Sequence, residues 1–378
     1  MLKTGSLLLS FFFIPLSFGA IPTVKILIGK SLENVVVEGT DLKKIYHLQK
    51  SSKSYQGRKA ISFNCARGKR ALASSNPLLV ATLTSPTGLI SWGKHKYQGD
   101  LQLLASPNHL NCDLVNEIPL EAYLRTLLSK EMNGTWPVEA LKAQAVAART
   151  YAFQRLRAQG KNADPGKLYH LESSEKDQVS GNFFDVTEKT LLASKDTEGE
   201  ILIGPTGKIT PAFFHSKCGG KTLRPDQVWG GVEEGYRSVN CTFCAKTGKK
   251  NWSTKVKNTK LLAMVDQALK KYYSDEAQTG AIKLMPDHVE NSELRLYVGD
   301  RLHIIKKSYL RNTVGREILP SNNFTISSLK GAFRVEGKGY GHGVGLCQLG
   351  ALELAKRGYS YKQILSFYFP RHKLKKVY

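Results

Sequence analysis

The spacing of apolar residues changes at Pro119, and this change constrains the fold more than any other feature of the sequence. Between residues 24 and 115, short runs of β-forming residues are divided by Ser, Asn and Gly, which predicts a β-rich unit. After Pro119 the spacing becomes helical, and we expect helices over about 119–132 and about 137–158, separated by Asn133-Gly134. A proline stands at the start of each helix, where a missing backbone N–H costs nothing.

The remainder of the chain returns to a mixture of β-like and helical runs. A basic, partly helical stretch covers about 255–275, and two short helices follow a glycine-rich segment, the second opened by Ser360 with Gln363 in a capping box. Strand-like runs lie at 197–203, 209–215, 294–298 and 302–305. Together these patterns predict a mixed α+β architecture.

Residues 1–20 have the composition of a cleaved export signal. Lys3 is followed by an apolar run from Leu7 to Phe18 and by small residues suited to signal-peptidase cleavage. An uncleaved anchor is the alternative, because Pro15 interrupts the run. No later stretch approaches the ~20 apolar residues that a membrane span requires. We therefore expect an exported protein of the periplasm, the cell envelope or the extracellular space.

The chain is strongly basic, with 55 Lys plus Arg against 31 Asp plus Glu and a formal net charge of +24. In a cytosolic protein this balance would indicate nucleic acid, but here the basic residues are scattered and not interleaved with aromatic residues, so no nucleic acid is expected. For an exported chain the expected polyanions are wall polymers, anionic lipid and lipopolysaccharide. A well-solvated basic surface is the alternative.

Glu131 is the acid of greatest chemical interest. It falls in the last turn of the first predicted helix, where the helix dipole disfavours a carboxylate, and Met132 and Trp136 would add desolvation. Both effects favour an acid that is still protonated near neutral pH, as a proton donor in glycoside cleavage must be. A solvated helix-end glutamate is the alternative. Glu121 and Glu139 lie in first turns instead, where they complement the dipole.

Arg149 projects from the second predicted helix, which is otherwise rich in alanine. Small side chains let neighbouring backbone come close, so a guanidinium there is either a buried structural clamp or a group that positions substrate. The sequence leaves both interpretations open.

The segment 337–345 has glycine at alternate positions, with His342 among the residues between them. In an extended segment this spacing bares one backbone face, which a sugar or an adjacent strand can approach. A tightly packed turn into the following helix is the alternative. The segment matches neither the dinucleotide-binding pattern nor the P-loop pattern.

The six cysteines suggest two kinds of cross-link. His215, Cys218, Cys241 and Cys244 have the ligand types and the paired spacing of a tetrahedral structural zinc site. A disulfide from Cys218 to Cys241 or Cys244 is the alternative, and an oxidising compartment favours it. Elsewhere Cys65 can pair with Cys112, and Cys347 is expected to be a buried thiol.

Several motifs, taken together, resemble the SpoIID/LytB (stage II sporulation protein D) family. They are PLEAYL at 119–124, EM at 131–132, WPVEALKAQAVAARTY at 136–151, FFHSKCGGKT at 213–222, DQVWGG at 226–231, GREILPSNNFTI at 315–326 and GKGYGHGVGLCQLGALELAKRGYSYKQILSFYFPR at 337–371. The resemblance covers roughly residues 110–371, in order. A match of several motifs is more specific than any one of them.

The resemblance implies peptidoglycan cleavage by a lytic transglycosylase with Glu131 as acid and then base, and it requires no cofactor for catalysis. It divides the chain into a signal peptide at 1–20, a β-rich N-terminal region at 21–110 and a SpoIID-like catalytic domain at 111–378. The side chains expected to line the glycan groove are Arg149, His215, Ser216, His342 and Gln348.

Two alternatives and one departure accompany this resemblance. LytB-like members are described as enhancers of a cell-wall amidase, so a non-catalytic wall-binding module is the second interpretation, and a hydrolase that adds water is the third. Some relatives hold a metal with Cys and His just after the long helix. This chain offers only His170 there, so we do not carry that site over and expect His170 on the surface or lining the site.

Overall fold

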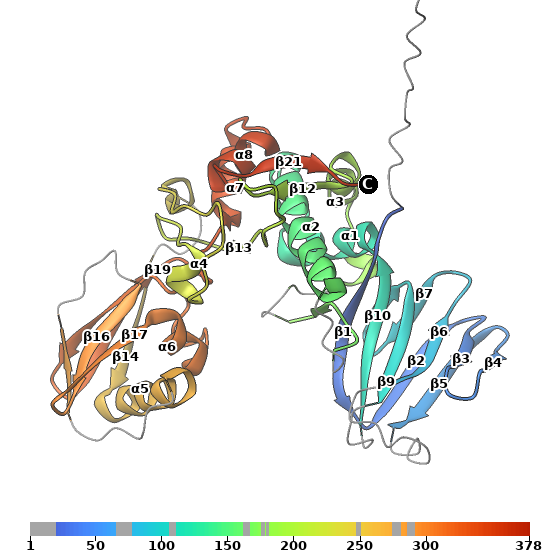
Figure 1. Cartoon of the computed structure of the whole chain (residues 1–378), viewed down its shortest axis with the longest axis horizontal. Helices are drawn as coiled ribbons and strands as arrows, with labels where there is room; N and C mark the ends of the chain where they lie inside the picture. The colour runs from blue at the N-terminus through green and yellow to red at the C-terminus, as the bar shows by residue number, and fades with distance from the viewer. Residues whose placement is uncertain are drawn as a thin grey trace, which may run out of the picture.

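The computed structural model describes an α+β protein, as the sequence predicts. The described residues are 20–65, 78–105, 111–161, 167–174, 178, 181–246, 251–273, 281–285 and 292–378. The predicted signal peptide lies outside them, except for Ala20. Within these ranges, every helix is too short or too polar to cross a membrane. Figure 1 shows two β-rich parts on opposite sides of a group of central helices.

The N-terminal part consists of two sheets whose inner faces form one core, and their strands pair in antiparallel fashion except for β11, which is parallel to β1. A seven-stranded sheet has the order β11-β1-β10-β9-β6-β3-β4, and a four-stranded sheet has the order β5-β2-β7-β8. Val37 from one sheet and Leu83 and Leu101 from the other are fully buried in the same cluster. The strands are β1 (Thr23–Leu32), β2 (Asn34–Thr40), β3 (Lys43–Tyr46), β4 (Ser51–Ser54), β5 (Arg58–Asn64), β6 (Leu78–Thr84), β7 (Leu89–Trp92), β8 (His95–Gln98), β9 (Asp100–Ala105), β10 (Cys112–Pro119) and β11 (Leu171–Glu172).

The boundary expected near residue 110 passes through the seven-stranded sheet. β1 pairs with β10 in antiparallel fashion, with Thr23 opposite Pro119. The expected disulfide between Cys65 and Cys112 is present and closes a separation of 47 residues. Residues on both sides of position 110 therefore share one sheet, one core and one covalent link.

The central helices are α1 (Leu120–Glu131), α2 (Val138–Lys161), α3 (Glu188–Asp196), α4 (Pro225–Val228), α7 (Gln348–Lys356) and α8 (Tyr361–Tyr368). Of these helices, α1, α2, α7 and α8 form where the sequence predicted helices, whereas α3 and α4 were not predicted. The predicted capping box of Ser360 with Gln363 opens α8. Two short strand pairs accompany them, β12 (Glu200–Ile203) with β21 (Lys373–Lys376) and β13 (Phe214–His215) with β20 (Leu346–Cys347). Two 3₁₀ turns cover Phe183–Asp185 and Phe243–Lys246.

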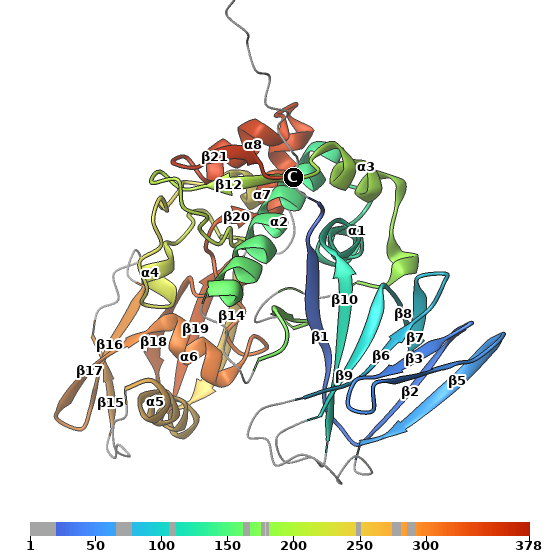
Figure 2. The same ribbon diagram turned by 45° about the vertical axis from the view of Figure 1, so that its right-hand side comes forward.

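Helix α2 is the hub of this layer, and its alanines explain why. Ala143 and Ala147 pack against residues of β20, α7 and α8, whereas Ala148 and Ala152 pack against α1 and β1. Figure 2 shows α2 between α1 on one side and α7 with β20 on the other. Side chains this small let several neighbours approach one helix closely.

Residues 251–338 form a third part, which the sequence patterns did not separate from the rest. It contains two three-stranded sheets, β14-β19-β18 and β15-β16-β17, and has its own hydrophobic core. Its elements are β14 (Asn251–Lys257), α5 (Asn258–Tyr273), β15 (Ile282–Leu284), β16 (Glu293–Val298), β17 (Arg301–Lys306), α6 (Lys307–Val314), β18 (Phe324–Leu329) and β19 (Ala332–Lys338). We call this part the inserted module, because it stands between the segments that form β13 and β20.

Candidate functional site

Glu131 is the last residue of α1 and is half-buried. The next residue, Met132, is buried and closes the helix by donating its backbone N–H to Leu128. Met132 belongs to a small hydrophobic cluster against which Trp136 packs. Glu131 thus lies at a helix C-terminus next to the buried Met132, which is the position that the sequence predicted.

The loop after Glu131 is held by its own hydrogen bonds. Asn133 accepts the backbone N–H and the hydroxyl of Thr135 through its side-chain oxygen, and its carbonyl accepts the N–H of Trp136. Thr187 at the start of α3 donates its hydroxyl to the carbonyl of Gly134. A loop fixed in this way gives Glu131 a defined position relative to α2 and α3.

Arg149 is a buried clamp, which decides between its two interpretations. Its guanidinium is fully buried and donates to both carboxylate oxygens of Glu121, from Nε at 2.6 Å and from Nη2 at 2.9 Å. It also donates to the carbonyls of Ser194 and Glu200. Because the guanidinium is fully buried and donates to Glu121, Ser194 and Glu200, Arg149 joins α1 and α2 to the segment of α3 and β12.

Glu121 likewise differs from the simple dipole interpretation. It lies in the first turn of α1, as expected, but its carboxylate is buried and faces Arg149. Burial alone would raise the pKa of Glu121, yet the hydrogen bonds and the charge of Arg149 outweigh it and hold this pKa below its usual value. Tyr378 and Ser194 also donate hydroxyls to it. Glu139 instead accepts the N–H of Tyr361 and caps α8.

His215 and His342 lie together, with ring centroids 5.5 Å apart. His342 donates from Nε2 to the carbonyl of Phe214 and accepts the N–H of Val344 at Nδ1, so the backbone uses both of its nitrogens. His215 donates from Nδ1 to the carbonyl of Val344, and its buried Nε2 has no hydrogen-bond partner in the structure. His342 is thus an organiser, and His215 keeps one acceptor for a ligand or a water.

Burial keeps both histidines neutral. It lowers the pKa of His215 to about 4, and burial together with the charge of His215 lowers the pKa of His342 to about 3. Around them stand Phe213 and Trp229, with the indole 5.1 Å from the ring of His342. Trp229 is 39% exposed and offers a flat apolar surface beside the pair.

The glycine segment serves close packing of backbone against backbone. Gly339 and Gly345 have positive φ, and a Cβ on either would collide with a carbonyl oxygen, that of Lys217 or that of Phe213. The bare backbone face of the glycine segment therefore packs against an adjacent chain segment, 213–219. This packing is what carries His342 to His215.

Ser216 and Gln348 lie near the histidine pair. β13 and β20 pair in parallel, with His215 opposite Cys347, so Ser216 and Gln348 follow the paired residues side by side. The carbonyl of Ser216 accepts the N–H of Leu349. Gln348 is buried and its amide nitrogen lacks a partner in the structure, as does the whole side-chain amide of Gln144 on α2.

Glu131 and the histidine pair lie at different faces of α2. The cluster beside Glu131 contains Leu141 and Ala145 of this helix, whereas the cluster against which Phe213 and Phe214 pack contains Ala143 and Ala147. In both Figures 1 and 2, α1 and the β13–β20 pair flank α2 from different sides.

Comparison with known proteins agrees with the motif resemblance. A family model described as SpoIID, stage II sporulation protein, matches residues 108–203. An uncharacterized protein of Brachyspira hyodysenteriae is 32% identical, over 72% of this chain and 71% of its own length. Stage II sporulation protein D of Bacillus subtilis is 26% identical, over 68% of this chain and 74% of its own. The chain belongs to the SpoIID/LytB family.

Another relative has a name that indicates a different role. The amidase enhancer of Bacillus subtilis is 29% identical over 65% of this chain, and the match spans 39% of that protein's length. SpoIID family membership, with relatives of both names, supports a cell-wall-related role. The family model covers Glu131, Glu121 and Arg149, whereas the histidine pair lies beyond the matched residues.

The SpoIID-like core also gathers four cysteines. Cys218, Cys241, Cys244 and Cys347 are buried and unpaired, and their sulfur atoms all lie within 4.8 Å of one another. We call this group the thiol cluster. Sequence spacing placed His215 in the fourth position, but the structure places Cys347 there and turns His215 to the carbonyl of Val344. The alternative disulfide of Cys218 is not formed.

Three functional candidates were not assigned from the sequence. Trp229 lies in the motif DQVWGG and Gln144 in the motif WPVEALKAQAVAARTY. Neither residue had a spacing or a neighbour that indicated a function. Cys347 follows the glycine segment, 129 residues from Cys218, and only the pairing of β13 with β20 brings the two together. His170 does not join these groups: its Nδ1 accepts the N–H of Lys25 at 2.8 Å, so it fixes β1.

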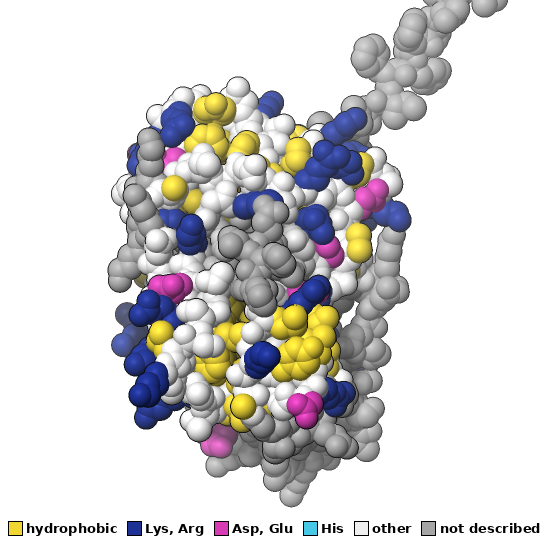
Figure 3. All heavy atoms as spheres, turned by 90° about the vertical axis from the view of Figure 1, so that its left-hand side faces the viewer, with side chains coloured by type: hydrophobic (Ala, Val, Ile, Leu, Met, Phe, Trp, Pro, Cys, Tyr) yellow, Lys and Arg dark blue, Asp and Glu magenta, His cyan; other side chains and the backbone are white. Residues whose placement is uncertain are grey.

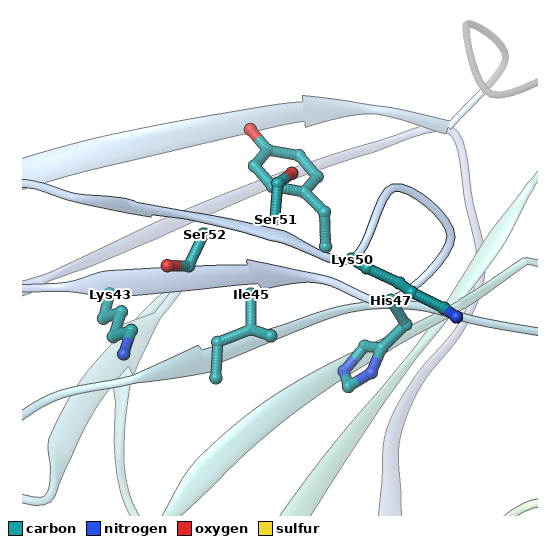
Figure 4. Close-up of a pocket in the computed structure, with 7 residues that line it drawn as sticks. Lys43, Ile45, His47, Lys50, Ser51 and Ser52 are labelled. Carbon is teal, nitrogen blue, oxygen red and sulfur yellow. The ribbon is translucent and has the colours of Figure 1, made fainter.

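A pocket elsewhere on the molecule has no link to these residues. Figure 4 shows it between β3 and β4, where it is lined by Lys43, Ile45, Tyr46, His47, Lys50, Ser51 and Ser52. β4 is the edge strand farthest in the sheet from β1 and β11. In Figure 3, lysine and arginine side chains are scattered over the visible face around a hydrophobic patch and do not form one stripe.

Proposed function

We propose that this chain is an exported peptidoglycan lytic transglycosylase in which Glu131 is the acid and then the base. The observation that carries the proposal is the family match over residues 108–203, which includes Glu131 and the loop that fixes it. The position of Glu131 at a helix C-terminus beside Met132 and Trp136 supports it, since such a position favours the neutral acid.

The reaction needs one carboxyl group and no water. The Glu131 acid donates its proton to the glycosidic oxygen that links N-acetylmuramic acid to the next sugar, and the bond from this oxygen to C1 breaks. The Glu131 carboxylate then takes the proton of the C6 hydroxyl of the same muramic acid, whose oxygen bonds to C1. The products are a 1,6-anhydro end and a new hydroxyl end, and Glu131 is again protonated.

The histidine pair supports a binding role in this proposal. The exposed indole of Trp229, beside the pair, offers a surface on which a sugar ring can stack, whereas Nε2 of His215 is itself buried. His342 holds the arrangement through its two backbone hydrogen bonds. Because the pair and Glu131 lie at different faces of α2, the pair would contact a part of the glycan other than the cleaved bond.

Product analysis tests the proposal. Purified wall glycan, both intact and stripped of peptides, is incubated with the wild type, with Glu131→Gln and with Glu188→Gln. Glu188 is an exposed acid in the first turn of α3, so its variant has the same change of charge near the same loop. We expect 1,6-anhydro ends by mass spectrometry from the wild type and Glu188→Gln, and none from Glu131→Gln. Reducing ends without the anhydro mass difference would identify a hydrolase instead.

An amidase enhancer is the second candidate, favoured by the similarity to a protein of that name. In that case the chain binds wall glycan and raises the activity of a cell-wall amidase without cutting glycan itself. Amidase stimulation that survives Glu131→Gln, with no anhydro ends from the wild type on either substrate, would replace the transglycosylase proposal by this one.

A further inference from the structure

The thiol cluster is the strongest feature that glycan cleavage does not use. Its four sulfur atoms come from three separate segments: the turn after β13, the 3₁₀ turn at Phe243–Lys246 with the residues before it, and the residue before α7. Each of the four side chains is at most 3% exposed. Four buried thiols within 4.8 Å of one another need a chemical reason.

The distances fit a metal better than a disulfide. A tetrahedral zinc ion with four thiolates at about 2.3 Å holds its sulfur atoms about 3.8 Å apart. Cys218 Sγ and Cys244 Sγ are 3.4 Å apart, well beyond the ~2.05 Å of an S–S bond. The same chain does form a disulfide between Cys65 and Cys112, so the four clustered thiols stay unpaired beside a cysteine pair that is oxidised.

The surroundings of the cluster suit thiolates. The backbone N–H of Gly220 points to Cys218 Sγ at 3.5 Å, and that of Cys218 points to Cys347 Sγ at 3.4 Å. The hydroxyl of Tyr368 lies 3.2 Å from Cys241 Sγ. Cys347 is the N-cap of α7, where the helix dipole favours negative charge. These donors offset the charge of a site with four thiolates and one divalent ion.

The backbone also leaves room for the sulfur atoms. Gly219 and Gly220, directly after Cys218, have φ of +77° and +121°, values that other residues rarely adopt. At Gly350 on α7, a Cβ would lie 2.8 Å from Cys241 Sγ and would collide with the hydroxyl of Tyr368. The C-x-x-C spacing of Cys241 and Cys244 is also usual for paired zinc ligands.

We propose that the thiol cluster binds one structural zinc ion through Cys218, Cys241, Cys244 and Cys347, without His215. Such an ion joins the chain just before the inserted module to the chain just after it, because Cys244 precedes β14 and Cys347 follows β19. It also holds β13 against β20 at the position of His215. This proposal does not depend on glycan cleavage, because its readout is the bound metal.

The experiment measures metal and thiols in the full-length protein, purified without metal-affinity resin. We expect one zinc per chain by elemental analysis, and its release in proportion to four thiols when a mercurial reagent is added. Replacement of zinc by cobalt should give the absorption of a tetrahedral tetrathiolate site. Cys347→Ser should lose most of the metal, whereas His215→Gln should keep it.

Three further variants keep the test independent of misfolding. Cys65→Ser with Cys112→Ser removes the disulfide and should leave the zinc content unchanged. Gly350→Ala changes no ligand but crowds Cys241, and it should weaken zinc retention against a chelator, while Gly231→Ala, at an open position without a positive φ, does not.

Three outcomes would overturn the proposal. They are wild-type protein with four free thiols and no bound zinc, a disulfide within the cluster after purification without reductant, and a cobalt spectrum that shows nitrogen ligation and changes in His215→Gln. The last outcome would restore His215 as the fourth ligand.

Discussion

The two ends of α1 use the same residue type in opposite ways. At its start, Glu121 is buried, paired with Arg149 and hydrogen-bonded to Tyr378 and Ser194. At its end, Glu131 is half-buried and precedes a loop held by Asn133 and Thr187. Glu121 is neutralised where α1, α2 and α3 meet, so it fixes the helices. Glu131 lies at the other end of the same helix and is partly exposed to solvent.

This difference teaches how position alone separates a structural acid from a candidate catalytic one. A buried ion pair contributes little net stability, but the loss of one partner leaves an uncompensated charge. The start of α1 should therefore respond strongly to mutation through stability. Its end should respond through activity with almost no change in stability.

The largest effect is expected from Glu121→Gln. The variant leaves the Arg149 guanidinium buried without its carboxylate, and we expect the free energy of unfolding to fall by about 3–5 kcal/mol. Urea denaturation followed by circular dichroism measures this. The double variant Glu121→Gln with Arg149→Met removes both charges and should regain part of the loss. If the double variant loses more stability than the two single variants lose together, the unpaired buried charge is not the main cause of the loss.

Tyr378→Phe should have a smaller effect. Its hydroxyl donates to the Glu121 carboxylate, and the loss of one hydrogen bond to a charged group should cost about 2 kcal/mol. Tyr359→Phe, at an exposed tyrosine near α8, is a matched control and should be neutral. Equal midpoints of urea unfolding for the two variants would contradict the role of Tyr378.

His170 should make stability depend on pH. Burial, followed by the charges of Lys25 and Lys167, lowers the pKa of His170 to about 4. In the unfolded chain the imidazole takes up a proton below pH ~6.5, whereas in the folded chain it does so only below about 4. The contribution of His170 to stability is therefore fully present above the unfolded pKa and is lost as pH falls from this value to the folded pKa.

His170→Asn tests this, because an amide oxygen can still accept the N–H of Lys25 but does not titrate. We expect the decrease in unfolding midpoint from pH 7 to pH 5 to be smaller in the variant than in the wild type. An equal decrease in the variant and the wild type would show that His170 takes up its proton at the same pH in the folded and the unfolded chain.

The smallest change in stability is expected from Glu131→Gln, within about 0.5 kcal/mol of the wild type, because a half-buried helix-end position rarely carries more. The same variant should abolish the formation of anhydro ends. A loss of several kcal/mol would show that Glu131 has a structural role like that of Glu121. The contrast between the two ends of α1 would then be wrong.

The sequence predicted the helices more fully than it predicted their partners. Proline, the Asn133-Gly134 step and helical spacing placed α1 and α2 within a few residues, because these signals act locally. Glu121 looked like a helix-start acid since its position fits that role. Its true partner, Arg149, lies 28 residues away, and no local pattern encodes that contact.

The thiol cluster shows the same limit. Spacing within one segment indicated Cys241 and Cys244 as a pair, but the choice between His215 and Cys347 depends on which strands meet. The inserted module was missed for a related reason. Its strands resemble those of the core in composition, and only tertiary packing shows that they bury their apolar faces in a separate cluster.

The pairing of β14 with β19 has a consequence for how this chain can vary. Asn251, where the inserted module begins, lies directly opposite Lys338, where it ends. Paired residues of antiparallel strands are only about 5 Å apart. The two chain connections between the module and the core therefore lie side by side. A tight hairpin could span the same gap. An exchanged or lengthened module that keeps the hydrogen bonds of Asn322 to the carbonyl of His342 and of Ser308 to that of Val228 should therefore leave the core segments in place.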